Sequence, residues 1–66
     1  MKLPRVLIVE DEHALALALA AAVRQSGIES DLAPTATRAR SQLESGTSYE
    51  AMILDIGLPD QNGLEF

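Results

Sequence analysis

The sequence predicts an α/β fold built on a parallel sheet, and two kinds of segment point to it. Residues 6–9 and 51–54 are short apolar runs without a polar alternation, which is typical of strands buried on both faces of a parallel sheet. Helix-forming segments and a short polar strand candidate stand between them. The resulting order of strand, helix, strand, helix and strand corresponds to two crossover units of an α/β sheet.

Each element between the two apolar runs has its own signal. Alanine and leucine, which are strong helix formers, dominate residues 14–23 and predict a helix. The Ser-Gly pair at 26–27 is typical of a helix C-terminus at which a glycine adopts the left-handed conformation. Residues 29–33 are polar enough to predict a strand at the sheet edge. A second helix is predicted from Thr35 to about Glu44. Its apolar residues are spaced three and four apart and predict one buried stripe, formed by Ala36, Ala39 and Leu43.

Length and composition exclude several classes of protein. The 66 residues carry a net charge of -5, which argues against direct nucleic-acid binding. The chain has no cysteine, so we expect no disulfide framework and no thiolate zinc site, and a cytoplasmic location is favoured. The longest apolar run is half of the roughly 20 residues that span a membrane. Chains below about 70–80 residues rarely form a sufficient core alone, so a metal, a partner or a further part of the domain is expected.

Acidic residues follow two of the predicted strands. Glu10, Asp11 and Glu12 come after the first strand, and Asp55 ends the third. Ligands of open α/β sheets bind beyond the carboxyl ends of the strands, where these carboxylates would converge if the two strands are neighbours. Like charges about 4 Å apart cost roughly 4 kcal/mol at an effective dielectric near 20, and a magnesium ion would offset that repulsion. In the alternative interpretation, residues 10–12 cap the next helix and Asp55 is a loop acid.

These residues resemble the N-terminal half of a bacterial response-regulator receiver domain. The match begins with the pair Glu10 and Asp11 and the later Asp55. It continues with two loop-shaping residues, Pro59 four residues after Asp55 and Gly63 eight residues after it. The resemblance covers essentially the whole chain. It implies a flavodoxin-like three-layer sandwich with spatial strand order 2-1-3, of which only the first strand-helix-strand-helix-strand portion is present.

The resemblance also implies a role for each site residue. Asp55 would accept a phosphoryl group from the phosphohistidine of a sensor histidine kinase. Mg²⁺ would be held by Asp55, by Asp11, by Glu10 through water, and by the backbone carbonyl of Gly57. The loop sequence Gly57-Leu58-Pro59-Asp60 is similar to that of receivers joined to winged-helix DNA-binding domains. The resemblance therefore implies that the parent protein is a transcriptional response regulator. The chain would be a phosphoryl acceptor and not an enzyme.

The chain departs from the receiver pattern in its second half. Residues 1–66 contain no fourth or fifth strand, hence neither the switch hydroxyl nor the phosphate-binding lysine of the family. Lys2, the only lysine, precedes the first strand, and Thr35, Thr37 and Thr47 lie on or beside the second helix. We therefore expect an incomplete receiver domain. The alternative function is a truncated or degenerate receiver that acts as a non-phosphorylated interaction module. A magnesium-dependent phosphatase is disfavoured because Gly57 stands where its second acid would be.

Two surfaces should be left open in such a chain. The first helix has no polar face along residues 14–23, and the third strand has no predicted neighbour beyond it. We therefore expect an isolated 66-residue chain to be marginal as a monomer. Either it is a fragment of a longer protein, or it self-associates through the open edge of the third strand and the first helix. His13 is expected to be a surface residue in the first helical turn. The Asp-Gln-Asn-Gly run at 60–63 lacks the other ligands of a calcium loop and predicts a turn.

Overall fold

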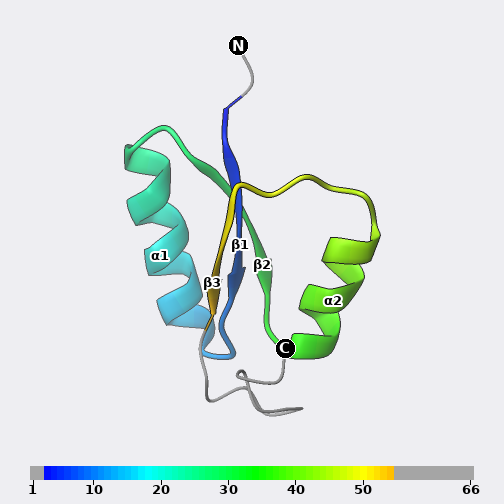
Figure 1. Ribbon diagram of the computed structural model, residues 1–66. Helices are drawn as coiled ribbons and strands as arrows, with labels where there is room; N and C mark the ends of the chain where they lie inside the picture. Colours follow the sequence, from blue (N-terminus) through cyan, green and yellow to red (C-terminus); the bar gives the residue numbers. More distant parts are fainter. Residues whose placement is uncertain (1–2, 55–66) are drawn as a thin grey trace.

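The computed structural model describes residues 3–54, and its elements follow the predicted order (Figure 1). Their bounds lie within a residue or two of the expected ones, because β1 and α1 each begin one residue earlier and α2 begins one residue later. The elements are β1 (Arg5–Val9), α1 (His13–Gln25), β2 (Glu29–Ala33), α2 (Ala36–Glu44) and β3 (Ala51–Leu54).

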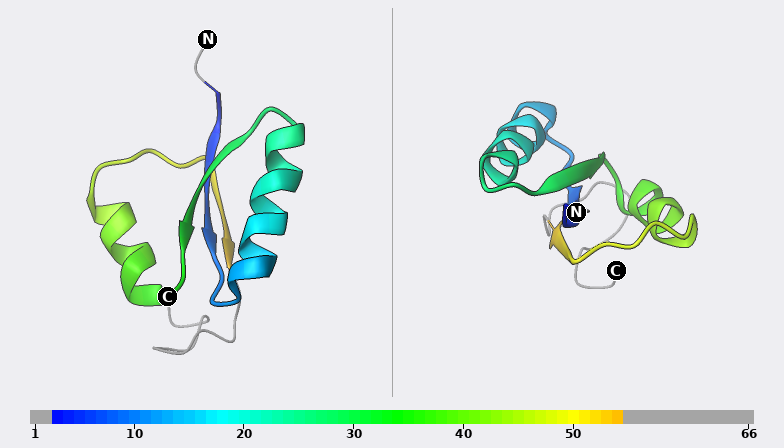
Figure 2. Two further views of the ribbon diagram at one scale, coloured as in Figure 1. Left: turned by 180° about the vertical axis from the view of Figure 1, so that it is seen from behind. Right: turned by 90° about the horizontal axis from the view of Figure 1, so that it is seen from above.

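The described strands form one parallel sheet in the order β2-β1-β3, which confirms the predicted order 2-1-3. In this register Val9 lies beside Ala33 on one side and beside Leu54 on the other, so the three strands end level with one another. The two helices cover opposite faces of the sheet (Figure 2). Both lie mainly over β1 and β2, which agrees with the greater exposure of β3.

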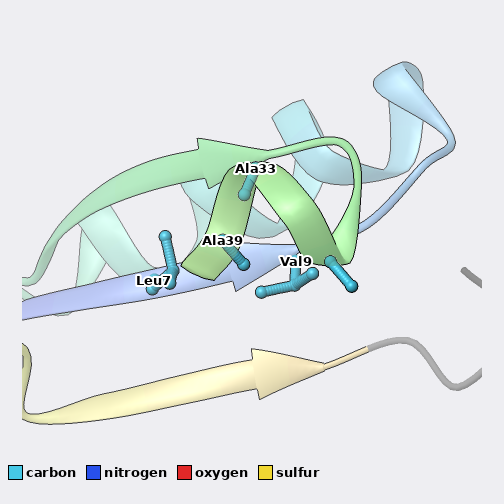
Figure 3. Close-up of a cluster of buried hydrophobic side chains, with 5 residues drawn as sticks. Leu7, Val9, Ala33 and Ala39 are labelled. Carbon is cyan, nitrogen blue, oxygen red and sulfur yellow. The ribbon is translucent and has the colours of Figure 1, made fainter. Parts of the chain in front are cut away.

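The core lies between β1 and the helices. On the face that α2 covers, Leu7 and Val9 pack with three alanines, Ala33, Ala36 and Ala39, all of them almost completely buried (Figure 3). Tyr49 and Leu54 pack against this cluster from the β3 side. Because side chains alternate along a strand, Val6 and Ile8 face the other way, toward α1, whose Ala16 is also buried. The central strand is therefore buried on both faces, as its continuous apolar run predicts.

Both helices have defined ends. The hydroxyl of Thr35 accepts a hydrogen bond from the backbone N–H of Arg38 at 3.1 Å and so caps the start of α2. After α1, Gly27 has a φ of 79°, and its N–H donates to the carbonyl of Arg24 at 2.9 Å. The next N–H, of Ile28, donates to the carbonyl of Val23 at 3.1 Å, which completes a Schellman motif. The predicted left-handed glycine end is confirmed.

Burial differs from the sequence prediction in two places. Leu43 is 43% exposed, so the predicted stripe of α2 is reduced to its two alanines, because the helix leans away from the sheet toward its C-terminal end (Figure 1). On β3, Ala51 and Met52 are exposed, since no described helix lies over them. On α1, by contrast, the exposure of Leu15 and Leu17 agrees with the prediction that the first helix leaves an apolar surface open.

Candidate functional site

Glu10 lies at the carboxyl end of β1, where the central strand turns toward α1. Its backbone N–H donates to the carbonyl of Ala33 at 3.0 Å and continues the pairing with β2 by one residue. The residue is only 8% exposed, and its Oε1 accepts a hydrogen bond from the backbone N–H of Glu12 at 3.0 Å. A buried carboxylate requires such partners, and this bond fixes its direction at the end of the strand.

The two acids after Glu10 point to solvent. Asp11 and Glu12 are exposed, and Glu12 is the residue before the first turn of α1. Its side chain makes no capping hydrogen bond, so side-chain capping by Glu12 does not explain this acidic run. His13, the first residue of α1, is exposed, in agreement with the predicted surface position. The acidic run thus presents one buried and oriented carboxylate, that of Glu10, followed by an exposed one on Asp11.

The third strand reaches the same edge of the sheet. Leu54, the last residue of β3, pairs with Val9, the residue before Glu10. Neighbouring strands are about 4.8 Å apart, so the described ends of β1 and β3 are within reach of one ligand. The other predicted site residues lie outside the described residues. They are Asp55, Gly57, Pro59 and Gly63.

The described carboxylates suit a hard cation without completing a site for one. Within residues 3–54, no three acidic or histidine side chains gather closely enough to hold a metal ion. Glu10 and Asp11 supply oxygen donors side by side at the carboxyl end of β1. Magnesium is commonly bound by one or two carboxylates together with water and phosphate oxygens, so this donor chemistry fits Mg²⁺.

A second polar cluster lies farther toward the amino-terminal side of the sheet, and the sequence analysis did not predict it. The Arg5 guanidinium contacts two acids of β2, with Nη2 at 2.7 Å from Glu29 Oε2 and Nη1 at 2.5 Å from Asp31 Oδ1. The hydroxyl of Tyr49 donates to the other oxygen of Asp31 at 2.6 Å. The pKa of Tyr49 is raised to about 12. Burial of the phenol is the largest cause, and the hydrogen bond to Asp31 and the negative charge of Asp31 raise the pKa further.

The signal for this cluster appears only once the strand register is known. Glu29 and Asp31 are two residues apart and therefore share one face of β2, and Arg5 is the register partner of Glu29. The cluster ties β1, β2 and the segment before β3 together. It lies away from Glu10 and Asp11, so its role is structural.

The fold and the acidic strand end define a class: a flavodoxin-like α/β domain with carboxylates at the carboxyl end of its central strand. Residues 6–66 match the response regulator receiver domain family. The chain therefore belongs to that family and is a receiver domain of two-component response regulators.

Several relatives resemble the chain in sequence. It is 42% identical to the transcriptional regulatory protein BasR of Escherichia coli over 62 residues, which are 94% of this chain and 28% of BasR. It is also 41% identical to the adventurous-gliding motility protein Z of Myxococcus xanthus over 59 residues, which are 89% of this chain and 4% of that protein. The chain thus spans less than a third of the length of these relatives.

Solved structures resemble it as well. A sensor protein from Polaromonas sp. JS666 superposes with a TM-score of 0.89 at 37% identity, and the non-phosphorylated HemR receiver domain from Leptospira biflexa with 0.81 at 32%. Each comparison covers 94% of this chain and 49% of the other chain. Neither described helix is long and apolar enough to cross a membrane.

Proposed function

We propose that the chain accepts a phosphoryl group on Asp55 from the phosphohistidine of a sensor histidine kinase. In this proposal residues 1–66 are the N-terminal part of a receiver domain, and the parent protein is a cytoplasmic transcriptional regulator. The observation that carries it is the register of β1 and β3, in which Leu54 lies beside Val9. Asp55 follows Leu54 by one peptide unit, about 3.8 Å between Cα atoms, and Glu10 follows Val9 in the same way.

The described carboxylates have separate tasks in this proposal. Mg²⁺ would be bound directly by the exposed carboxylate of Asp11 and through water by Glu10. Asp55 and the backbone carbonyl of Gly57 would complete the site. When bound, Mg²⁺ supplies positive charge against the oxygens of the transferring phosphoryl group. Glu10 keeps its direction because the N–H of Glu12 holds one of its oxygens.

The transfer exchanges one bond to phosphorus for another. A carboxylate oxygen of Asp55 attacks phosphorus in line, the P–N bond of the phosphohistidine breaks, and the imidazole of the kinase leaves with the bonding electrons. The product is an acyl phosphate on Asp55. The chain is the phosphoryl acceptor in this reaction and is itself converted to the phosphorylated product. Because the transfer does not regenerate the unmodified chain, we do not class it as an enzyme.

A second candidate function is a protein-interaction module that is not phosphorylated. The exposed leucines of α1, Leu15 and Leu17, favour it, because an apolar helix face is a common contact for a partner. The two functions differ in what they require of Asp55. Phosphoryl transfer needs its carboxylate, whereas partner binding through α1 does not.

Labelling with acetyl phosphate separates the two. The wild-type chain is expected to form one acyl phosphate in the presence of Mg²⁺. Mass spectrometry would detect it as an increase of about 80 Da, the mass of one phosphoryl group. Asp55→Asn should abolish the label, and Asp60→Asn, which changes another aspartate of the same segment, should retain it. A label that persists in Asp55→Asn would show that the acceptor is a different residue, and no label in the wild type would favour the interaction module.

A further inference from the structure

The first turn of α1 is hydrogen-bonded to the buried carboxylate of Glu10. This turn lies at the carboxyl end of the sheet, where β1 also ends (Figure 1). The backbone N–H of Glu12 donates to Glu10 Oε1 at 3.0 Å, and the carbonyl of Glu12 accepts from the N–H of Ala16 at 2.9 Å. Glu12 is thus held by the carboxylate on one side and by the helix on the other. A movement of this turn relative to β1 would therefore change the contact between Glu12 and Glu10.

Ala16 marks the place where α1 lies closest to the sheet. Among residues 13–25, all of which the structure describes, it alone is buried, with 3% exposure. Leu19, Ala20 and Val23, which share its face at helical spacing, are only partly buried. From the strand, the fully buried side chain of Ile8 faces α1. The helix therefore meets β1 most closely near its beginning, at a residue whose side chain is a single methyl group.

The size of the side chain at Ala16 determines how closely the helix can approach. Because protein interiors are close-packed, a larger side chain at this position must displace either the strand or the helix. The strand is held on both sides by β2 and β3. The helix is freer to move, since Leu15 and Leu17 on its outer face are exposed. A larger side chain would therefore push the first turn of α1 outward, together with the N–H of Glu12.

We propose that Ala16 is a positioning residue for the binding of Mg²⁺ by Glu10. Its small side chain keeps α1 close to β1, and this spacing holds the Glu12 N–H on the Glu10 carboxylate. Ala16 acts through Glu12 and needs no contact with the ion. The inference rests on the proposed function, because it concerns the Mg²⁺ that Glu10 would hold through water. Residues that orient a metal ligand commonly change the affinity for the metal by about ten- to a hundred-fold when they are altered.

Substitutions of increasing size at Ala16 test this inference in the ¹⁵N-labelled full chain. The first measurement, without metal, is the chemical shift of the Glu12 amide proton, which a hydrogen bond to a carboxylate moves downfield. In Ala16→Leu this signal should move upfield, toward its position in Glu10→Ala, which lacks the acceptor. The second is a Mg²⁺ titration followed by the amide signals of Glu10 and Asp11. The half-saturating Mg²⁺ concentration should rise about ten-fold in Ala16→Leu.

Two control variants separate positioning from a general loss of stability. Leucine is nearly as good a helix former as alanine, whereas glycine is much worse. Ala16→Gly therefore destabilises α1 but lets it stay close to β1, so the Mg²⁺ affinity of the folded chain should remain near the wild-type value. Ala18→Leu adds the same atoms at an exposed position of the same helix and should change neither measurement. Ala16→Val, with two added methyl groups, should give intermediate values and carries the test if Ala16→Leu does not fold.

Several outcomes would overturn the inference. One is an unchanged Glu12 signal in the larger variants of Ala16, and another is a signal that moves while the Mg²⁺ affinity stays the same. A loss of affinity in Ala16→Gly or Ala18→Leu equal to that in Ala16→Leu would also overturn it. A wild-type chain without saturable Mg²⁺ shifts would refute the proposed magnesium site and the effect on affinity with it. The Glu12 signal would still show whether Ala16 sets the contact with Glu10, so the two failures are distinguishable.

Discussion

The hydroxyl of Tyr49 donates a 2.6 Å hydrogen bond to Asp31, across 18 residues of sequence. Asp31 uses its two oxygens for two different donors, because Oδ1 contacts the guanidinium of Arg5 while Oδ2 accepts from Tyr49. A single carboxylate on the edge strand β2 thus holds the start of β1 and the segment that leads into β3. Three segments distant in sequence therefore meet at this one side chain.

Tyr49 is the only tyrosine and the chain has no tryptophan, so ultraviolet absorbance reports its ionisation directly. We expect a tyrosinate titration with a midpoint of about 12 in the folded chain. Asp31→Asn removes the negative charge and the charged acceptor, so it should move the pKa of Tyr49 down toward its ordinary value of about 10. Glu44→Gln, on the exposed surface of α2, is the control and should leave the midpoint in place. An equal midpoint in wild type and Asp31→Asn would contradict the contribution assigned to Asp31 and leave burial as the cause.

The same shift predicts how the stability changes with pH. Because the pKa of Tyr49 is higher in the folded state, the folded chain binds more protons than the unfolded chain between about pH 10 and 12. The contribution of the Tyr49 hydroxyl to the free energy of unfolding is fully present below about pH 10 and is lost as the pH rises toward 12. Tyr49→Phe should lower the free energy of unfolding at neutral pH by about 1 kcal/mol, the usual net value of one hydrogen bond. Urea unfolding at several pH values tests this, and the difference between variant and wild type should shrink above pH 10. A constant difference would contradict the prediction.

Magnesium affinity should depend on the two carboxylates at the end of β1. Glu10→Gln keeps the shape of the side chain and its bond to the N–H of Glu12 but removes its charge. We expect the Mg²⁺ concentration for half-maximal labelling by acetyl phosphate to rise about ten-fold or more, as is typical for outer partners of a metal site. Asp11→Asn, which changes the proposed direct ligand, should raise it further.

Glu12→Gln serves as the matched control, since Glu12 is an exposed acid in the same turn and has no proposed role. Its Mg²⁺ dependence should equal that of the wild type. A comparable change in all three variants would point to a general loss of negative charge and not to a defined site.

The turn after α1 gives a prediction that concerns stability alone. Gly27 has a φ of 79°, where a residue with a Cβ is strained by roughly 1–2 kcal/mol. Nothing lies within 4 Å of an added Cβ, so the backbone and not a clash determines the cost. Gly27→Ala should therefore lower the free energy of unfolding by about 1 kcal/mol. Ser26→Ala, at the neighbouring residue with a negative φ, should change it much less. Thermal or urea unfolding measured by circular dichroism distinguishes the two.

The predictable features of this fold are those that depend on local sequence. The apolar runs at 6–9 and 51–54 and the glycine at 27 each act through neighbouring residues, and each is found where the sequence places it. The strand order came from the family resemblance and is also confirmed. For the candidate site, the sequence identified the acids at the end of β1, and the structure adds that Glu10 is buried and oriented.

Features that depend on packing between distant segments were not predictable. The exposure of Leu43 follows from the angle at which α2 leaves the sheet, and no pattern within the helix records that angle. The pairing of Arg5 with Asp31 requires the register of β1 and β2, because the two residues are 26 positions apart. The roles of Asp55 and Gly57 remain predictions, since both lie outside the described residues.

The open edge of β3 should make the 66-residue chain self-associate. Met52 is 39% exposed on a strand that has β1 on one side and no described strand on the other. Unpaired backbone groups at such an edge favour pairing with a second chain, and a lysine on an edge strand opposes it. We expect sedimentation velocity to show species larger than the monomer, with an average mass that rises with concentration. Met52→Lys should shift the distribution toward the monomer. Leu43→Lys adds the same charge at a similarly exposed leucine of α2 and should leave the distribution unchanged. A wild-type chain that sediments as a monomer and unfolds cooperatively would refute the prediction, because the β3 edge would then need no partner.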